Sequence, residues 1–379
     1  MKILISSGSR GEWGYYKPII EELVKRKIEY DIMTMNMAST YEYGNLYQVL
    51  KDQGYNVKHN ILCSFHGDSH YAMSKMFSSL SSSVADILAN YKYDWVLIAG
   101  DRVEQLAVAT IASLQYIPCA HIQAGELSGN IDGVTRHVIG KLVKLHFAAN
   151  KDAYDRLLKL GEENERVILS GAPQLDDIFK FDSNKVNLLP ELIDLKNGDF
   201  ILAVFHGVTE ELDECYEGLK NMTKALSNEK KKIIYISPNN DAGGITINRI
   251  IESERRRGDL IFNNLDRNQY LYLLDNCEFI IGNSSSGLLE APIFKTFCIN
   301  IGNRQLNRVQ GENVVDSTYD FKNILDSINY IRTSNSYKES VLKMISPYGE
   351  SPASCIIVNE LTDKNHKPDS FLQVRRITY

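Results

Sequence analysis

The stretch WVLIAGDRVEQLAVATIASL, residues 95–114, decides the predicted fold class. Its apolar start at 95–99 is typical of a buried strand, and after Gly100 it continues into a helix-length segment at 103–114. The same alternation fills the first half of the chain, with strands at 2–6, 31–35, 119–123 and 167–170 and helices at 16–25 and 72–90. Short apolar strands that alternate with helices predict βαβ units and a parallel α/β sheet.

The pattern restarts after the Gly-Ala-Pro segment at 171–173. Further strands are expected at 200–205, 233–237, 260–262, 279–281 and 297–301. Residues 182–199 lack a strong period and indicate a linker with a short helix. We therefore predict two Rossmann-like domains, 1–172 and 173–379, that face a cleft, and we leave open that the last helical segment packs back on the first domain. Ligands of such sheets bind beyond the carboxyl ends of the strands.

Length and composition agree with two soluble domains. The chain has 379 residues, and roughly 150 residues per domain is the usual soft guide. Hydrophobic residues make up 44% and charged residues 24%, which excludes a disordered, collagenous or coiled-coil protein. The net charge of −6 gives no general attraction for nucleic acid or for an anionic membrane, so any bound phosphate needs a local site.

The cysteines and histidines do not predict a metal site or a disulfide framework. Six cysteines are scattered without a CxxC pair, and Cys119 and Cys298 lie in apolar runs. His66, Asp68 and His70 lack further ligands at a recognisable spacing. Glycine interrupts the apolar run at the start of the chain too early for a signal peptide, and no apolar stretch reaches membrane-spanning length. We expect a cytoplasmic protein without metal or cofactor.

The first motif is GSRGEWG, residues 8–14, which follows the first strand. It is not a dinucleotide fingerprint, because Arg10 stands where that pattern needs glycine, and it is not a P-loop, because no GK[ST] follows. Glycines between strand and helix let the backbone approach a phosphate, and Arg10 adds a planar charged fork. The alternative is a tight turn with a surface arginine.

The second motif is Gly100-Asp101-Arg102, which comes directly after the strand at 95–99. A carboxylate at the carboxyl end of a parallel strand lies at the ligand-binding edge of the sheet. The alternative is structural, since Asp101 could cap the helix at 103–114.

The third motif is HIQAGELSGNID, residues 121–132, which leads to Arg136 and His137. Here a strand opens into a glycine-containing loop with two more carboxylates, Glu126 and Asp132. Acid–base work on a sugar carbon needs one group that takes a proton and another that gives one. Three carboxylates after two adjacent strands, Asp101, Glu126 and Asp132, are hard to explain as helix caps, and they are our candidates for this acid–base work.

The second half carries FHGVT at 205–209, PNNDAG at 238–243 and GNSSSGLLE at 282–290. In the last of these a Gly/Ser loop follows a strand and opens a helix, so hydroxyls and N–H groups could hold a diphosphate without a metal. Glu290, expected near the first turn, could reach ribose hydroxyls. Its alternative role is a favourable charge at the positive end of a helix.

Taken in order, these motifs resemble the UDP-N-acetylglucosamine 2-epimerases, a family with a two-Rossmann-domain GT-B fold. The resemblance runs from residue 1 to about 358. GSRGEWG is similar to the GTRAEYG or GNRADYS of the hydrolysing branch, and HIQAGELSGNIDGVTRH to its HIxGGExSGxIDxxxRH. GDRVEQLAVATIASL, HGVT, PNNDAG, GNSSSGLLE, IGNRQLNRVQGENV and the late PYG also have counterparts there. Non-hydrolysing relatives carry a proline where this chain has Gly11, and a PEExxR segment in place of IDGVTRH.

The resemblance implies a reaction and a set of roles. UDP is eliminated from UDP-GlcNAc and the resulting 2-acetamidoglucal is hydrated, which gives ManNAc, a precursor of sialic-acid-type sugars, with C2 inverted. The implied catalytic carboxylates are Asp101 and Asp132. The implied UDP-binding side chains are Arg10, Arg102, His206, Asn239, Ser284, Ser285, Glu290 and Arg304.

One departure concerns Gln123, which stands where the family usually has a catalytic glutamate. An amide cannot act as a carboxylate base, so either Glu126 substitutes or the work is divided differently, and we place Gln123 among the substrate-binding residues. The alternative function is the same reaction on UDP- or GDP-N,N′-diacetylbacillosamine in legionaminic-acid synthesis. A GT-B glycosyltransferase and a nucleotide-sugar sensor are more distant alternatives. The expected partners are a nucleotide sugar and other copies of the chain, as a dimer or tetramer.

Overall fold

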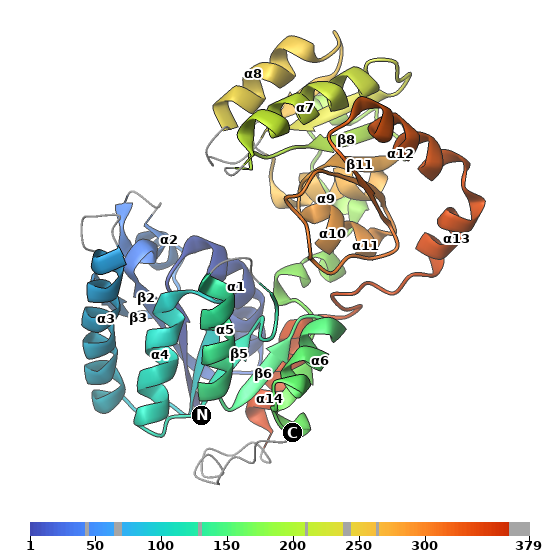
Figure 1. Ribbon diagram of the computed structural model, residues 1–379. Helices are drawn as coiled ribbons and strands as arrows, with labels where there is room; N and C mark the ends of the chain where they lie inside the picture. The colour runs from blue at the N-terminus through green and yellow to red at the C-terminus, as the bar shows by residue number, and fades with distance from the viewer. Residues whose placement is uncertain are drawn as a thin grey trace. The chain divides into compact units, whose positions relative to one another are not determined.

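The chain is described here by a computed structural model, which places residues 1–41, 45–63, 70–127, 131–208, 211–237, 244–262 and 265–363. At positions 10, 11, 70, 131, 132, 244 and 245 only the backbone is described. The chain divides into two compact units, Met1–Asp177 with Ser351–Tyr379, and Ile178–Glu350 (Figure 1).

The first unit contains a seven-stranded sheet in the order β3-β2-β1-β4-β5-β6-β7, and all neighbouring strands are parallel. Its strands are β1 (Lys2–Ser7), β2 (Glu29–Met35), β3 (Val57–Ile61), β4 (Trp95–Ala99), β5 (Cys119–Ile122), β6 (Leu145–Ala148) and β7 (Val167–Leu169). β3 and β6 were not among the predicted strands.

Helices cover both faces of this sheet, which explains the continuous apolar run of β4. Trp95, Leu97 and Ala99 pack with one cluster of helices, and Val96 and Ile98 pack with the other, because successive strand residues point to opposite faces. The first cluster includes α1 (Arg10–Lys25), α2 (Leu46–Asp52) and α14 (Ala353–Thr362), and the second α3 (His70–Asn90), α4 (Val103–Leu114) and α5 (Ile131–Leu142). α6 (Lys151–Lys159) packs on β7 and β6.

Helix α1 begins at Arg10, six residues before the predicted start at residue 16. The turn after β1 therefore contains only Gly8 and Ser9. Oε2 of Glu12 accepts a hydrogen bond from the backbone N–H of Gly8 at 2.7 Å, which ties the turn to the first helical residues. Tyr16, Ile19 and the following apolar positions of the helix are buried against the sheet. Burial of this face outweighs the low helix propensity of the glycines at 11 and 14.

The predicted domain boundary needs two corrections. The first unit continues to residue 177 rather than ending at 172. It also includes the segment from Ser351 onward, which we had placed in the second domain while leaving open that the last helical segment packs back on the first. Both carboxylate oxygens of the buried Asp176 accept hydrogen bonds from the first backbone N–H groups of α14, those of Ala353 at 2.7 Å and Ser354 at 2.8 Å. Ile357 and Val358 then pack with α1 in the core. These contacts hold the last helix on the first unit.

The second unit contains a six-stranded parallel sheet in the order β10-β9-β8-β11-β12-β13. Its strands are β8 (Phe200–Val204), β9 (Lys232–Ile236), β10 (Leu260–Phe262), β11 (Phe279–Gly282), β12 (Phe297–Ile301) and β13 (Val314–Ser317), the last of which was not predicted. Its helices are α7 (Leu212–Leu226), α8 (Gly244–Glu254), α9 (Arg267–Asn276), α10 (Ser286–Leu289), α11 (Ala291–Phe294), α12 (Phe321–Thr333) and α13 (Asn335–Lys343). Short 3₁₀ turns at Ser183–Lys185 and Pro190–Leu192 lie in the predicted linker. Both units therefore confirm the predicted parallel α/β class.

Candidate active site

The carboxyl edge of the first sheet brings together three segments of the predicted site around Arg136. Asp101 follows β4, Gln123 and Glu126 follow β5, and Arg136 lies on α5. Arg136 is 7% exposed, and its guanidinium pairs with the carboxylate of Asp101. Its Nη1 donates to the carbonyl of Gln123 at 2.6 Å and lies 4.0 Å from Oε2 of Glu126. Arg136 is the second-to-last residue of the segment HIQAGELSGNIDGVTRH, and its pairing role was not predicted from the sequence.

The capping alternative for Asp101 does not hold. Arg102, not Asp101, occupies the N-cap position of α4, while the carboxylate of Asp101 pairs with Arg136. The guanidinium of Arg102 bonds to the buried carboxylate of Glu104 at 3.1 and 3.2 Å. Asp101 is therefore paired with a cation at the sheet edge instead of capping the helix.

The turn before Asp101 is fixed by a buried histidine. Gly100 has a φ of +79°, which favours glycine, and its carbonyl lies 2.6 Å from Nε2 of His121 on β5. Burial lowers the pKa of His121 to about 3, so the ring is neutral and Nε2 carries the hydrogen that is donated to Gly100. His121 consequently shapes the turn and does not serve as the base.

Glu126 is held by two side-chain amides. Because an ionised carboxylate accepts only from a donor, the amide of Gln123 is assigned with its NH₂ group toward Glu126, which puts the nitrogen 2.6 Å from Oε2 and 3.2 Å from Oε1. Nδ2 of Asn150 donates to Oε1 at 3.2 Å. Burial, with a contribution from the negative charge of Glu126, raises the pKa of the Tyr15 phenol to about 12, so Tyr15 stays protonated. Neither Asn150 nor the role of Tyr15 was predicted from the sequence.

Three of the predicted site residues cannot be placed by their side chains. Asn239 lies outside the described residues, and at Arg10 and Asp132 only the backbone is described. Arg10 begins α1, and Asp132 lies on α5, four residues before Arg136. The HGDSH segment at 66–70 also falls outside the described side chains.

In the second unit, Asn283 joins the predicted residues at the carboxyl ends of β8 and β11. Its Oδ1 accepts from the backbone N–H of His206 at 2.7 Å, and its Nδ2 donates to the carbonyl of His206 at 2.8 Å. The carbonyl of Asn283 accepts from Nη1 of Arg304 at 3.1 Å and from Nε2 of Gln305 at 2.9 Å. Asn283 is fully buried, so it positions His206 and Arg304 rather than meeting a ligand itself.

Residues 283–286, called the serine loop below, lead into α10, which is a helix of one turn. Ser284 Oγ lies 3.2 Å from Ser286 Oγ and accepts from its backbone N–H at 3.3 Å, and the hydroxyl of Tyr270 contacts Ser286. Ser285 occupies the N-cap position of α10. The cradle for a diphosphate would therefore consist of serine hydroxyls and loop amides rather than the end of a long helix.

Glu290 was expected near the first turn of this helix, and it directly follows α10, which is a single turn. It lies at the junction between α10 and α11, where Oε1 pairs with Nη1 of Arg267 at 2.7 Å. The break follows from Pro292, which has no N–H to continue the helical hydrogen bonds. Glu290 thus follows the serine loop by one helical turn, with a cation beside it.

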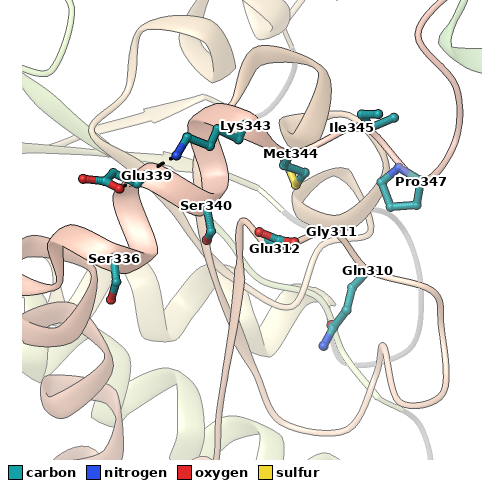
Figure 2. A pocket seen from close by; sticks show the side chains of 10 residues that line it. All are labelled: Gln310, Gly311, Glu312, Ser336, Glu339, Ser340, Lys343, Met344, Ile345 and Pro347. Carbon is teal, nitrogen blue, oxygen red and sulfur yellow. Dashed lines mark ion pairs between the residues drawn. The ribbon is translucent and has the colours of Figure 1, made fainter.

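Two cavities in the second unit lie apart from most predicted residues. One of about 750 Å³ is lined by the β12–β13 loop and α13, where Figure 2 shows an ion pair between Glu339 and Lys343, 4.0 Å apart. It contains none of the predicted site residues. The other, of about 380 Å³, includes Gln305, the neighbour of Arg304.

Across the described residues, no group of three or more His, Cys, Asp and Glu side chains could hold a metal ion. Within the same part of the chain, no helix is long and apolar enough to cross a membrane.

Comparison with known proteins identifies the family. The family model described as UDP-N-acetylglucosamine 2-epimerase matches residues 21–362. A GDP/UDP-N,N′-diacetylbacillosamine 2-epimerase (hydrolyzing) of Campylobacter jejuni is 32% identical, over 83% of this chain and 84% of the relative. A UDP-N-acetylglucosamine 2-epimerase of Neisseria meningitidis serogroup B is 29% identical over 86% of each chain.

Solved structures support the same conclusion for the fold. The crystal structure of a UDP-GlcNAc 2-epimerase from Neisseria meningitidis bound to UDP-GlcNAc matches with a TM-score of 0.74 and 22% identity, over 95% of this chain and 99% of that one. At 22% identity this similarity is evidence for the fold alone, and it confirms the predicted α/β, GT-B-like class. Together with the family match over most of the sequence, it leads to one conclusion: the chain belongs to the UDP-N-acetylglucosamine 2-epimerase family.

Proposed function

We propose that the protein is a hydrolysing UDP-GlcNAc 2-epimerase, which converts UDP-GlcNAc and water into ManNAc and UDP. The observation that carries this proposal is the cluster of Asp101, Glu126 and Arg136 at the carboxyl edge of the first sheet. Family membership supplies the substrate class. The hydrolysing outcome is supported by the hydrolysing branch's motifs and by the name of the Campylobacter relative.

The reaction needs two opposed proton transfers at C2 of the sugar. A carboxylate takes the C2 proton, the C2–H electron pair forms the C1=C2 bond, and the C1–O pair leaves with UDP. Water then gives one proton to a carboxylate as its oxygen bonds to C1. The C1=C2 electron pair takes a proton from an acid on the other face of C2, which inverts that carbon. Stabilising the departing diphosphate helps the first step, because the C2 hydrogen becomes acidic only as C1 gains positive character.

In this scheme Asp101, Glu126 and Asp132 are the proton-transfer groups. Arg136 balances the charge of Asp101 and lies within 4.0 Å of Glu126, so two carboxylates can stay close together beside one cation. Gln123 has no basic group and is assigned to contact with the substrate. The neutral His121 is excluded as the base by its low pKa.

The second unit is proposed to bind the UDP part. Arg304 offers positive charge to the diphosphate, the serine loop offers hydroxyls and amides, and Glu290 is suited to ribose hydroxyls. The proposed contacts of this unit are His206, Asn239, Ser284, Ser285, Glu290 and Arg304, and the first unit is proposed to contribute Arg10 and Arg102. No metal ion takes part in this scheme.

A second candidate is the same reaction on UDP- or GDP-N,N′-diacetylbacillosamine. It is favoured by the Campylobacter relative's name and by Gln123, which stands where the family usually has a catalytic glutamate.

One experiment tests the reaction and separates the substrates. The protein is incubated with UDP-GlcNAc or with its 2,4-diacetamido analogue in deuterated water, and the products are followed by NMR. We expect free UDP together with a 2-epimerised sugar that carries deuterium at C2. Release of UDP with hydrogen retained at C2 would indicate simple hydrolysis, and a requirement for an acceptor sugar would indicate a glycosyltransferase.

A further inference from the structure

The carboxylate of Glu126 receives hydrogen bonds from two neutral amides. The amide nitrogen of Gln123 lies 2.6 and 3.2 Å from its two oxygens, and Nδ2 of Asn150 lies 3.2 Å from Oε1. Hydrogen bonds to a carboxylate favour its ionised form, and neutral donors do so without cancelling its charge.

The orientation of the Asn150 amide is fixed by a second contact. Its Oδ1 accepts from the backbone N–H of Ala153 at 2.9 Å, which makes Asn150 the N-cap of α6, so its NH₂ group faces Glu126. In the assigned orientation the amide oxygen of Gln123 lies 3.1 Å from both the nitrogen and the oxygen of the Gln174 amide, so the orientation of Gln123 follows from the need of the Glu126 carboxylate for a donor.

The loop that carries Glu126 is itself fixed. Gln123 has a φ of +60°, and its carbonyl accepts from Arg136 at 2.6 Å. The carbonyl of Gly125 accepts from Nη1 of Arg156 at 2.8 Å. A Cβ at Gly125 would lie 2.5 Å from the carbonyl oxygen of Ala153, so the loop packs directly on α6. The amides therefore act on a carboxylate whose backbone has little freedom to move.

Among the described residues, charged or titratable groups of several elements lie near this carboxylate, its loop or its partner Arg136. Arg136 of α5 lies 4.0 Å away and also pairs with Asp101, which follows β4. Arg156 of α6 bonds to the backbone of the loop. Tyr15 of α1 stays protonated, because burial and then the charge of Glu126 raise its pKa to about 12.

We propose that Gln123 and Asn150 are positioning residues, which keep Glu126 ionised and aimed for proton transfer with the sugar. The inference rests on the proposed function, in which Glu126 is one of the proton-transfer groups. If an N–H donor is lost, the ionised form is less favoured, and the carboxylate then titrates at higher pH.

Each variant removes one hydrogen-bond donor of Glu126 and keeps as much as possible of the side chain that carried it. Asn150→Ser keeps a side-chain oxygen that can cap α6, and Gln123→Met keeps the chain length without an amide. Asn45→Ser is the matched control, because Asn45 caps α2 through Gln48 in the same unit. We expect kcat to fall about tenfold in both variants. KM should change little in Asn150→Ser and should rise in Gln123→Met, which also loses its proposed contact with the substrate. The acidic limb of the kcat/KM profile should move to higher pH, and the control should keep the wild-type profile.

A titration without turnover separates this inference from the proposed function. Carboxyl ¹³C NMR on glutamate-labelled protein follows Glu126, with its signal assigned by Glu126→Gln. If the wild type releases no UDP from either sugar nucleotide, the proposed function fails, while an upward-shifted titration of Glu126 in Asn150→Ser still supports the positioning contacts. An identical titration in the wild type and both variants would overturn the positioning role. Wild-type turnover in Glu126→Gln would overturn the catalytic role of Glu126.

Discussion

Glu12 on α1 is a buried carboxyl group whose replacement should change the pH dependence of stability. Oε2 accepts from the backbone N–H of Gly8 at 2.7 Å and from Nε2 of Gln105 at 2.9 Å. Among the described residues, Oε1 is buried without a hydrogen-bond partner. Burial, with a contribution from the nearby charge of Glu104, raises the pKa of Glu12 to about 8. Glu12→Gln keeps one acceptor oxygen and cannot ionise.

The sign of the effect follows from proton binding in the two states. An unfolded Glu12 loses its proton near its ordinary pKa of 4.5, whereas the folded protein keeps the proton up to about pH 8. Between these values the folded state binds more protons, so the wild type loses about 1.4 kcal/mol of stability per pH unit from this group. Over the whole interval this reaches about 5 kcal/mol in favour of the variant, as an order of magnitude.

The assay is urea denaturation at several pH values between 4.5 and 8.5. Both tryptophans of the chain, Trp13 and Trp95, lie in the first unit, so their fluorescence reports its unfolding. The control is Glu22→Gln in the same helix. Burial of Glu22 opposes its charge, but hydrogen bonds from Arg26 and Lys25 outweigh this and lower its pKa. The control should therefore lose stability relative to the wild type at neutral pH, and that loss should vanish on acidification.

Parallel stability profiles for wild type and Glu12→Gln between pH 5 and 8 would refute this reasoning. They would mean that Glu12 is already ionised in the folded protein at neutral pH.

Three predictions concern the proposed reaction. Asp101→Asn and Asp132→Asn should each lose about 10²–10⁴-fold in kcat but still bind UDP in calorimetry, because a positioned acid or base is worth that much; near wild-type turnover in both would show that their roles are wrong. Ser285→Ala combined with Glu290→Ala should weaken UDP binding strongly, and unchanged affinity would remove the serine loop from the nucleotide site. Turnover should survive EDTA, since cationic side chains and loop amides are proposed to neutralise the diphosphate; activity that disappears and returns with magnesium would contradict this.

The sequence by itself determined the elements whose signal is local. The run at 95–99 is apolar throughout because β4 is covered on both faces, and its composition alone therefore indicates a buried strand. Helix α4 has the predicted bounds, Val103–Leu114, since its apolar pattern begins and ends with the helix. The loops that bear Asp101 and Glu126 could be foreseen for the same reason, because each directly follows such a strand.

Elements that are formed by hydrogen bonds to segments distant in sequence could not be predicted from local composition. β6 and β13 have four residues each and include His146 or Asp316, so their composition does not distinguish them from loops. Each becomes a strand by pairing with a neighbour already in the sheet. Likewise, α1 starts at Arg10 because Glu12 ties back to the turn and the sheet buries the helix, against the local preference of two glycines.

Only the tertiary structure decided how the site is held together. Asp101 is a paired carboxylate rather than a helix cap because Arg136, 35 residues later, reaches it from α5. His206 is fixed by Asn283 across 77 residues, and the last helix returns to Asp176 across 177. A local pattern shows which residue types follow a strand, but a partner this distant in sequence becomes a neighbour only when parallel strands align their carboxyl ends. The polar groups are therefore visible in the sequence, and their pairing is a property of the fold.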